Sequence, residues 1–582
     1  MAAGALLVAL AVAAAVRATT AAVSTAALDA TEDKPLLFVD AAVLASASDG
    51  LELQVHPPSH GPLVLWPTEP WESWAVFGSN SVVQLRPGDA NYSAEASVRM
   101  YYDCVEIGTQ GHWGQLGNDR SCVAVSPDGV TWIKPRLDIV RYQGQPSNIV
   151  ANCVSPAVFI DRKPGVPDSQ RWKMLCSNTV WAGADGWHFE PMFGAGHKSI
   201  QHKDDTMDVG SYDSALAMYV IFVRRDIPVA GKTPSVHRRI GRCETDDLSN
   251  WEKFAPANGC ESVFGPDALD PDMVDVYTSS WTRYAGIEWF FPTFYHQFPN
   301  SNHSSPDGFP NDGLLAIRLA VSRSTRNLSY VATGAGATRV AIGRGADSPG
   351  FRAPFVAWGV NTCGEWAVHP SLPGGWCDVK NGALATTSFD TSGGYMVAGA
   401  VDSSDGLEVL TYASGQPFTH GGDIANVTWR NNTGIRLLRS RKHGWVSIAA
   451  AYMFNRPRHQ MPHLVTKPLL IATGAQSAAI VSAGRNQPRQ KLLSLLLNVK
   501  TSNVGFVVVE LRNASSGLAL PGFELNASDP IRTNSVAAAA SWRGGELRSL
   551  ESFKGEELVV VVAMADAQLF SLWFGLSPVP DS

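Results

Sequence analysis

Alternating and continuously apolar positions mark the C-terminal part of the chain. The runs 491–499, 504–511 and 558–563 are of this kind, and Gly, Pro and Asn residues separate them. Short runs of this length, bounded by turn residues, predict β-strands, and their succession predicts a β-sandwich. We place this sandwich at about residues 434–582.

A tight turn followed by an aromatic residue recurs through the earlier part of the chain. It is clearest at Ser126–Trp132 and Asp185–Phe189, with looser copies at Thr245–Trp251, Ser322–Tyr330 and the Asp405-Gly406 turn. The spacing of roughly 55 to 80 residues is typical of one four-stranded propeller blade with its loops. Glycine tolerates positive φ, aspartate caps its own turn, and the tryptophan that follows can fill the gap between neighbouring blades. Five copies predict an all-β protein whose five-bladed β-propeller occupies residues 30–433.

The composition agrees with many short strands and narrows the choice of partners. Charged residues make up only 17% of the 582 residues, and there are 52 glycines and 36 prolines. The net charge is −7, and no long basic run occurs, which argues against a nucleic-acid partner.

The N-terminus predicts export. Ala5–Val16 is an uninterrupted apolar run, followed by Arg17 and then by small residues. This is typical of a signal peptide, which we assign to residues 1–27, and the run is too short for a membrane span. We therefore expect a secreted or secretory-pathway protein that is monomeric and has no stable membrane insertion.

Cysteines and glycosylation sequons fit an oxidising compartment. Eight cysteines, an even number, suggest disulfides. Sequential pairing would give Cys104–Cys122, Cys153–Cys176, Cys243–Cys260 and Cys363–Cys377, each within or beside one blade. Seven Asn-x-Ser/Thr sequons lie at Asn91, Asn302, Asn327, Asn426, Asn431, Asn513 and Asn526. No Cys-x-x-Cys occurs, so we expect neither a zinc site nor a cofactor.

A propeller followed by a sandwich resembles the invertase-type glycoside hydrolases of family 32 and their five-bladed family 43 relatives, the arabinanases and xylosidases. The chain is similar in particular to a family-32-like group with a C-terminal β-sandwich. The matching segments are Leu37–Asp40, Pro70–Glu72, Val98–Tyr102, Ser126–Trp132, Arg239–Trp251, Tyr277–Trp281, Lys467–Leu469, Pro521–Phe523 and Ser541–Gly545. The resemblance implies a carbohydrate substrate or ligand.

Three sequence blocks of true invertases are missing or altered. The chain has no Asn-Asp-Pro, Arg225-Asp226 is followed by Ile227 instead of proline, and Cys260-Glu261 reverses the order of the third block. No invertase catalytic residue can therefore be carried over to this chain.

Acidic residues nevertheless precede the expected inner strands of the propeller. Inner strands all run in the same direction, so Glu72, Asp208, Asp275 and Asp378 should gather at one end of the channel. Glycoside hydrolysis needs two carboxyl groups across the scissile bond, one ionised and one protonated. We expect Asp208 to be the base or nucleophile, Glu72 the proton donor and Asp275 the residue that tunes them.

Other side chains near these acids could contact a sugar. The candidates for substrate binding are Trp71, Trp281, Asp205, Asp272 and Arg225. Each also has a plainer interpretation, because such acids are often turn caps, tryptophans often pack between blades and arginines often form surface ion pairs.

Two other functions remain open at this point. A propeller that has lost its acids could bind carbohydrate without cleaving it, and the missing invertase blocks favour this alternative. A sialidase-like enzyme is the second alternative, but it would require six blades and a cluster of three arginines. Paired carboxylates in the channel would favour hydrolysis.

Overall fold

The computed structural model describes residues 27–31, 34–89, 91–106, 119–176, 179–192, 208–228, 236–248, 260–267, 270, 274–297, 313–326, 328–330, 339–341, 355–356, 394–415, 433–451, 457–472, 480–481 and 489–578. These residues form strands, turns and short 3₁₀ turns, and none of them lies in an α-helix. The 3₁₀ turns are η1 (Ala41–Val43), η2 (Pro70–Glu72), η3 (Ala94–Ala96), η4 (Asp168–Gln170), η6 (Arg458–Gln460) and η7 (Glu551–Phe553). The expected all-β class is confirmed.

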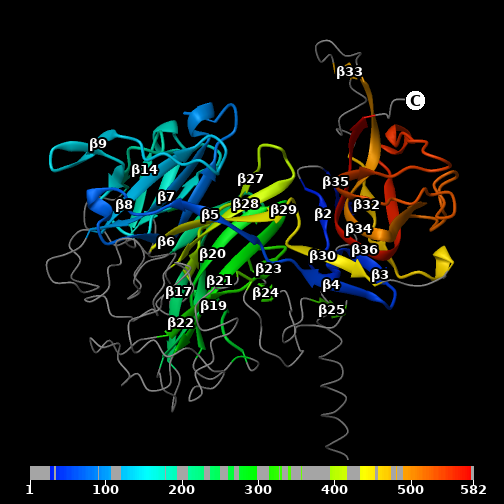
Figure 1. Ribbon diagram of the computed structural model, residues 1–582, viewed down its shortest axis with the longest axis horizontal. Coiled ribbons are helices and arrows are strands. Elements are labelled where there is room, and N and C mark those ends of the chain that lie inside the picture. Colours follow the sequence, from blue (N-terminus) through cyan, green and yellow to red (C-terminus); the bar gives the residue numbers. More distant parts are fainter. Residues whose placement is uncertain are drawn as a thin grey trace, which may run out of the picture.

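Five separate sheets form the five predicted blades of the propeller (Figure 1). The first contains β6 (Ala75–Gln84), β7 (Val98–Val105), β8 (Asp119–Ser126) and β11 (Ile149–Ala151). The second contains β12 (Ala157–Ile160), β13 (Trp172–Cys176), β14 (Thr179–Gly183) and β15 (Glu190–Pro191). The third contains β16 (Val209–Asp213), β17 (Met218–Pro228), β18 (Val236–Thr245) and β19 (Glu261–Phe264).

The last two blades have five strands each. The fourth contains β20 (Val274–Tyr284), β21 (Ile287–Gln297), β22 (Gly313–Ile317), β23 (Ala320–Ser322) and β24 (Ser329–Tyr330). The fifth contains β26 (Gly394–Met396), β27 (Val401–Asp402), β28 (Glu408–Gly415), β29 (Gly434–Arg441) and β5 (Ser59–Leu65). A hairpin of β9 (Leu137–Tyr142) and β10 (Gln145–Ser147) projects from the first blade.

The propeller is closed by strands from distant parts of the chain. The inner strands β6, β12, β16, β20 and β26 contact one another in a closed ring. Ser81 in β6 forms a parallel bridge with Ala398, which follows β26, so the first and last inner strands run in the same direction. The outermost strand of the fifth blade is β5, which precedes the first blade in sequence. A blade built from both ends of the propeller ties the ring together.

The recurring turns lie between blades, as their sequence predicts. Asp128 Oδ1 accepts hydrogen bonds from the backbone N–H groups of Val130 and Thr131, both at 2.8 Å. Trp132 folds back and donates to the carbonyl of Gly129, and its ring meets Tyr412 of the fifth blade edge-on at 5.5 Å. The second copy packs in the same way, because Tyr101 of the first blade donates to the carbonyl of Gly186. The motif therefore serves the contact between neighbouring blades.

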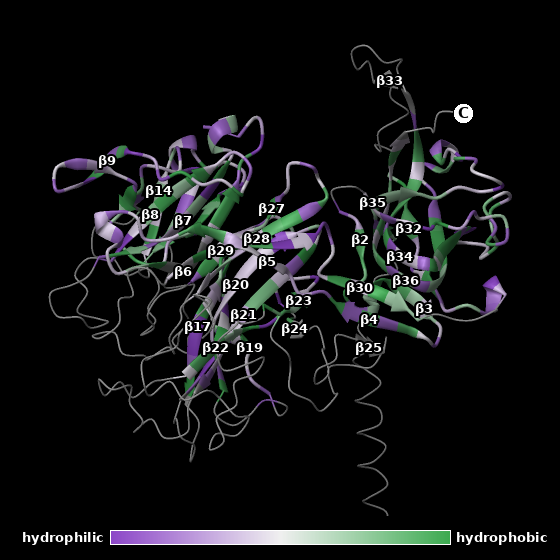
Figure 2. Cartoon of the chain, viewed as in Figure 1, coloured by the Kyte–Doolittle hydropathy of each residue, from purple (hydrophilic) through white to green (hydrophobic). Residues whose placement is uncertain are grey.

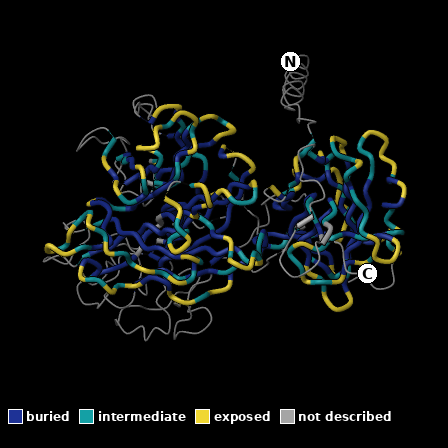
Figure 3. Tube along the Cα trace, turned by 90° about the horizontal axis from the view of Figure 1, so that it is seen from above, coloured by how far each residue is buried: buried dark blue, intermediate teal, exposed yellow. Residues whose placement is uncertain are grey.

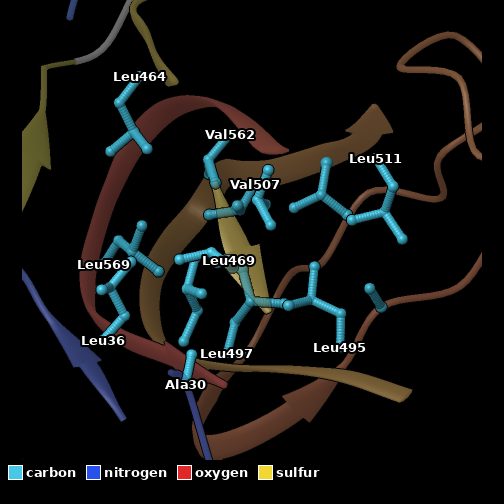
Figure 4. Packing of buried hydrophobic residues seen from close by; sticks show 14 of the residues in the cluster. Ala30, Leu36, Leu464, Leu469, Leu495, Leu497, Val507, Leu511, Val562 and Leu569 are labelled. Carbon is cyan, nitrogen blue, oxygen red and sulfur yellow. The ribbon is translucent and has the colours of Figure 1, made fainter. Parts of the chain in front are cut away.

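A twelve-stranded sheet forms the second unit, at the right of Figure 1. Its early strands are β1 (Leu28–Asp29), β2 (Leu36–Leu37), β3 (Leu44–Ala47), β4 (Leu51–Val55) and β25 (Arg339–Ala341). Its later strands are β30 (Val446–Ala450), β31 (His463–Thr466), β32 (Leu469–Leu470), β33 (Ile480–Val481), β34 (Arg489–Asn513), β35 (Asn534–Ala539) and β36 (Glu557–Pro578). The two long strands β34 and β36 pair along most of their length, and two register shifts let them curve around a core of buried leucine and valine side chains (Figure 4).

Strand pairing divides the chain differently from the boundary expected at residues 433 and 434. Strand β29 pairs with β28 and β5, so it belongs to the propeller, whereas β1 to β4 join the twelve-stranded sheet. Sequence periodicity predicts strands but not their partners, and here the partners of β4 are β25 and β30, which lie hundreds of residues later in the chain. Hydrophobic strands fill the interior of both units, and polar residues gather in the turns (Figure 2). The same turns carry most of the exposed backbone (Figure 3).

Three of the four expected disulfides are present. They join Cys104 to Cys122, Cys153 to Cys176 and Cys243 to Cys260, one in each of the first three blades. Cys363 and Cys377 lie outside the described residues, as does the expected signal peptide up to residue 26. Among the described residues, no helix is long and apolar enough to cross a membrane.

Candidate functional site

The site expected from the sequence lies where the inner strands begin, which we call the start face of the propeller. Asp208 directly precedes β16, and Asp275 is the second residue of β20. Their sequence neighbours Val209 and Val274 belong to one hydrophobic cluster, and β16 contacts β20. These two carboxyl groups therefore belong to neighbouring inner strands, but Val209 pairs with Phe222, whose ring meets Trp281, so Asp208 lies further along the channel than Asp275.

Asp275 is the acid with the most unusual surroundings. Only 1% of the residue is exposed, and its Oδ1 lies 2.9 Å from Nδ1 of His237 in β18. Burial raises the pKa of Asp275, although the hydrogen bond from His237 and the nearby charge of Arg238 act in the opposite direction. A carboxyl group with a raised pKa can hold a proton at a pH where ordinary aspartates are ionised.

The other acids predicted for this site are only partly placed. Asp208 is half-buried at the edge of the described part of the start face. Asp205, Asp272 and Asp378 lie outside the described residues.

Glu72 does not have the surroundings expected of a proton donor. It is fully buried, and both carboxylate oxygens are occupied by protein groups. Tyr102 donates to Oε1 at 2.8 Å, whereas Lys134 Nζ lies 2.5 Å from Oε2. The backbone N–H groups of Thr68 and Glu69 also donate to Oε2. This network fixes the loop before β6 against the first blade, and a substrate has no access to the carboxylate within it.

Trp71 belongs to the same network and is likewise unavailable to a ligand. Its Nε1 donates to Asn148 Oδ1 at 2.8 Å, and only 3% of the residue is exposed. Asn148 in turn donates to Tyr102. The ring of Trp71 belongs to a hydrophobic cluster with Leu65 and Leu437 of the fifth blade, which agrees with the plainer interpretation of packing between blades.

Trp281 and Arg225 also have structural contacts. The Trp281 ring packs between Phe222 and Phe290, and its Nε1 donates to Glu288 at 2.7 Å. It lies seven residues into β20, toward the far end of the channel from Asp275. Arg225 donates to the carbonyl of Cys260 beside a disulfide. The contacts described for Trp281 and Arg225 do not include Asp275.

A cationic and aromatic group that sequence reasoning missed lies next to Asp275. The guanidinium groups of Arg224 and Arg238 lie 5.6 and 4.9 Å from the ring centre of Tyr277, two residues after Asp275. Tyr277 also packs against Tyr295 and Tyr395. The available sequence signal was the pair of dipeptides Arg224-Arg225 and Arg238-Arg239, but only the strand register, which pairs Arg225 with Arg239, shows that they lie side by side.

The remaining features are possible metal ligands and the predicted glycosylation sites, which the structure describes in part. No cluster of possible metal ligands occurs within the described ranges. Of the sequons, Asn91 and Asn526 are exposed, whereas Asn513 is half-buried and its side-chain oxygen accepts hydrogen bonds from Ser515 and Ser516. Asn302, Asn327, Asn426 and Asn431 lie outside the described residues.

No protein-family model matches the sequence, and no curated protein is similar to it at a significant level. Solved structures with a distant likeness include an N-acetylgalactosamine deacetylase from F. plautii in complex with blood group B trisaccharide. It is 10% identical, with a TM-score of 0.36 over 67% of this chain and 95% of that one. A family 43 arabinoxylan arabinofuranohydrolase from Bacillus subtilis, in complex with cellotetraose, is 10% identical with a TM-score of 0.31 over 87% and 96%. A glycoside hydrolase described as putative, from Parabacteroides distasonis, is 11% identical with a TM-score of 0.33 over 67% and 96%.

The likeness to these structures is too distant to assign an activity. The class of this protein, a five-bladed β-propeller joined to a twelve-stranded sheet, rests on its own strand pairing.

Proposed function

We propose that the protein is a secreted glycoside hydrolase whose active site lies on the start face of the propeller. The observation that supports this proposal is Asp275, a buried carboxyl group with a raised pKa on an inner strand, beside the strand that Asp208 precedes. Two carboxyl groups in different environments are what glycosidic bond cleavage requires.

The proposed roles follow from these environments. Asp275 donates its proton to the glycosidic oxygen as the bond to the departing sugar breaks, and His237 orients its carboxyl group. Asp208, which is half-buried, is the ionised partner that attacks the sugar or activates water. Asp275 thus takes the role that the sequence suggested for Glu72, because Glu72 is enclosed by protein donors.

The fold affects the two alternative functions, a sialidase-like enzyme and a non-catalytic carbohydrate-binding propeller, in different ways. Five blades disagree with the six of a sialidase-like enzyme. A propeller that binds carbohydrate without cleaving it remains the competing function, and it requires no chemistry from Asp275. Activity therefore has to be measured separately from binding.

The test compares Asp275→Asn and Asp208→Asn with the unchanged protein on a panel of aryl glycosides and oligosaccharides. Each variant should lose on the order of 10² or more in kcat/KM, the scale of general acid–base catalysis. Asp138→Asn is a matched control, because Asp138 lies on the exposed β9 hairpin with a 63% exposed side chain. Thermal unfolding checks that all three variants fold.

Each outcome of this comparison decides between the functions. Loss of hydrolysis in both start-face variants with full activity in the control supports the proposal. Glycan binding without release by the unchanged protein would support the binding alternative. Full hydrolysis by both variants would instead refute the roles proposed for Asp275 and Asp208.

A further inference from the structure

A cavity of about 480 Å³ lies where the inner strands of four blades finish, and the first residues of the inner strand β16 also line it. We call this the end face. The cavity is lined by residues from or beside all five inner strands and by the turn 442–443, which leads toward the twelve-stranded sheet. Tyr284 lines it and is nine residues beyond Asp275 in β20, a separation of about 30 Å along a strand. The cavity is therefore separate from Asp275, although Val209, the residue that follows Asp208, also lines it.

Hydrogen bonds between inner strands hold the wall of this cavity in place. Ser81 Oγ accepts from the backbone N–H of Val158 at 2.7 Å, which joins the first blade to the second. Thr282 Oγ1 accepts from the backbone N–H of Gly399 at 2.8 Å, which joins the fourth blade to the fifth. Side chains carried by these strands are thus positioned before any ligand arrives, which lowers the entropic cost of binding.

The cavity has an excess of positive charge. Four cationic side chains line it, and two of them are neutralised: Arg162 pairs with Asp89, and Arg283 pairs with Asp213 and Glu288. The other two cations are Arg86 and Lys442. Within the described part of the chain, neither has a carboxylate within ion-pairing distance.

Two further lining residues define the charge of the cavity. Asp402 is the one acid of the lining, and it accepts a hydrogen bond from the Tyr284 hydroxyl at 3.1 Å. Burial, together with the charge of Lys442, lowers the pKa of His443 to about 3, so this ring is neutral near pH 7. Two cations without partners therefore face a single acid, and an anionic group would restore the balance.

Neutral polar and aromatic groups complete the lining. Gln84, Ser211 and Thr282 offer side chains that exchange hydrogen bonds with hydroxyl groups, and Tyr284 supplies aromatic surface. A bare inorganic anion would use the two cations and leave these groups without a role. A volume of about 480 Å³ is in the range of small-molecule sites.

We propose that the end-face cavity binds an acidic monosaccharide unit of the hexuronate class. Lys442 and Arg86 meet its carboxylate, while Gln84 and Asp402 meet ring hydroxyls. Binding at this site does not depend on hydrolysis, and it would retain an acidic glycan toward the finish of the inner strands, away from Asp275.

Isothermal titration calorimetry of the full chain with glucuronate tests the proposal, with glucose and sulfate titrated at the same ionic strength. Glucuronate should bind with at least tenfold higher affinity than either. Lys442→Gln should weaken glucuronate binding about tenfold or more, the scale of one hydrogen bond to a charged group. Lys500→Gln, at an exposed lysine of β34, is the matched control and should bind as the unchanged protein does.

The remaining outcomes locate the site and its specificity. Arg86→Gln should weaken binding in the same direction, and it replaces the Lys442 variant if that one does not fold. Asp275→Asn should leave glucuronate affinity unchanged, which separates this site from the proposed active site. No glucuronate binding, equal affinity for glucose or sulfate, or unchanged affinity in both cation variants would overturn the proposal.

Discussion

Acidification should destabilise the protein at His443, in the turn between β29 and β30. Only 6% of this residue is exposed, and its ring centre lies 5.6 Å from that of Tyr284 and 6.1 Å from that of Trp573. These contacts join the propeller to the twelve-stranded sheet. Burial and the neighbouring charge of Lys442 lower the pKa of His443 from 6.5 to about 3.

The size of the effect follows from this pKa shift. Because the pKa is lower in the folded state, the unfolded chain binds the proton first as the pH falls. The stability contribution is complete above about pH 6.5 and is lost progressively toward pH 3. Between pH 7 and pH 5, the free energy of unfolding should fall by about 2 kcal/mol through His443 alone. Burial also lowers the pKa of His296 to about 3, so that ring adds an effect of the same sign.

The variant His443→Asn separates this residue from other titrating groups. His443 has a φ of 55°, a conformation that asparagine adopts more readily than most residues. Urea unfolding followed by tryptophan fluorescence is suitable, because Trp573 lies against the ring. Between pH 7 and pH 5, the free energy of unfolding of the variant should fall by about 2 kcal/mol less than that of the unchanged protein. His459→Asn, at an exposed histidine, is the control, and an unchanged pH dependence in His443→Asn would refute the reasoning.

Two further substitutions test how the blades are held together. Lys134→Met should destabilise the protein by about 3–5 kcal/mol in chemical denaturation, because the Glu72 carboxylate stays buried without its cation. The double variant Glu72→Gln/Lys134→Met should recover a large part of this loss, and no recovery would show that packing of Lys134 is what matters. Gly186→Ala should lower the unfolding midpoint more than Gly406→Ala. Both glycines have positive φ, but only at Gly186 would a Cβ lie 2.7 Å from Arg99 Nη1, whereas nothing lies within 4 Å at Gly406. Equal midpoints would refute this account of the contact between blades.

The sequence alone determined the repeated part of the structure. Each Asp-Gly turn carries its own capping oxygen and its own positive-φ residue, so the turn forms from local interactions wherever the phrase occurs. The bridged cysteines are 17 to 23 residues apart, so one hairpin or one loop is sufficient to bring each pair together. The expected sequential pairing is therefore confirmed for the three described disulfides. Five turns at blade spacing were therefore sufficient to predict five blades.

The surroundings of the acidic residues could not be predicted from the sequence. Glu72 and Asp275 both precede or open an inner strand, and the sequence gives no reason to treat them differently. Their difference comes from residues remote in the chain: Lys134 and Tyr102 enclose Glu72, whereas His237 and Arg238 surround Asp275. A pKa depends on desolvation and nearby charge, and both are set by tertiary neighbours.

Tertiary structure also decided how the chain is divided and closed. The propeller range 30–433 expected from the sequence contains both β4 and β5, but β5 completes the fifth blade whereas β4 pairs with β30 of the twelve-stranded sheet. Backbone hydrogen bonds in a sheet join residues hundreds of positions apart, and local propensity carries no information about such partners. The sequence thus determined that the chain is rich in strands and how often the blade repeats. Long-range pairing joined the runs 491–499 and 504–511 into the single strand β34 and decided which side chains surround each acid.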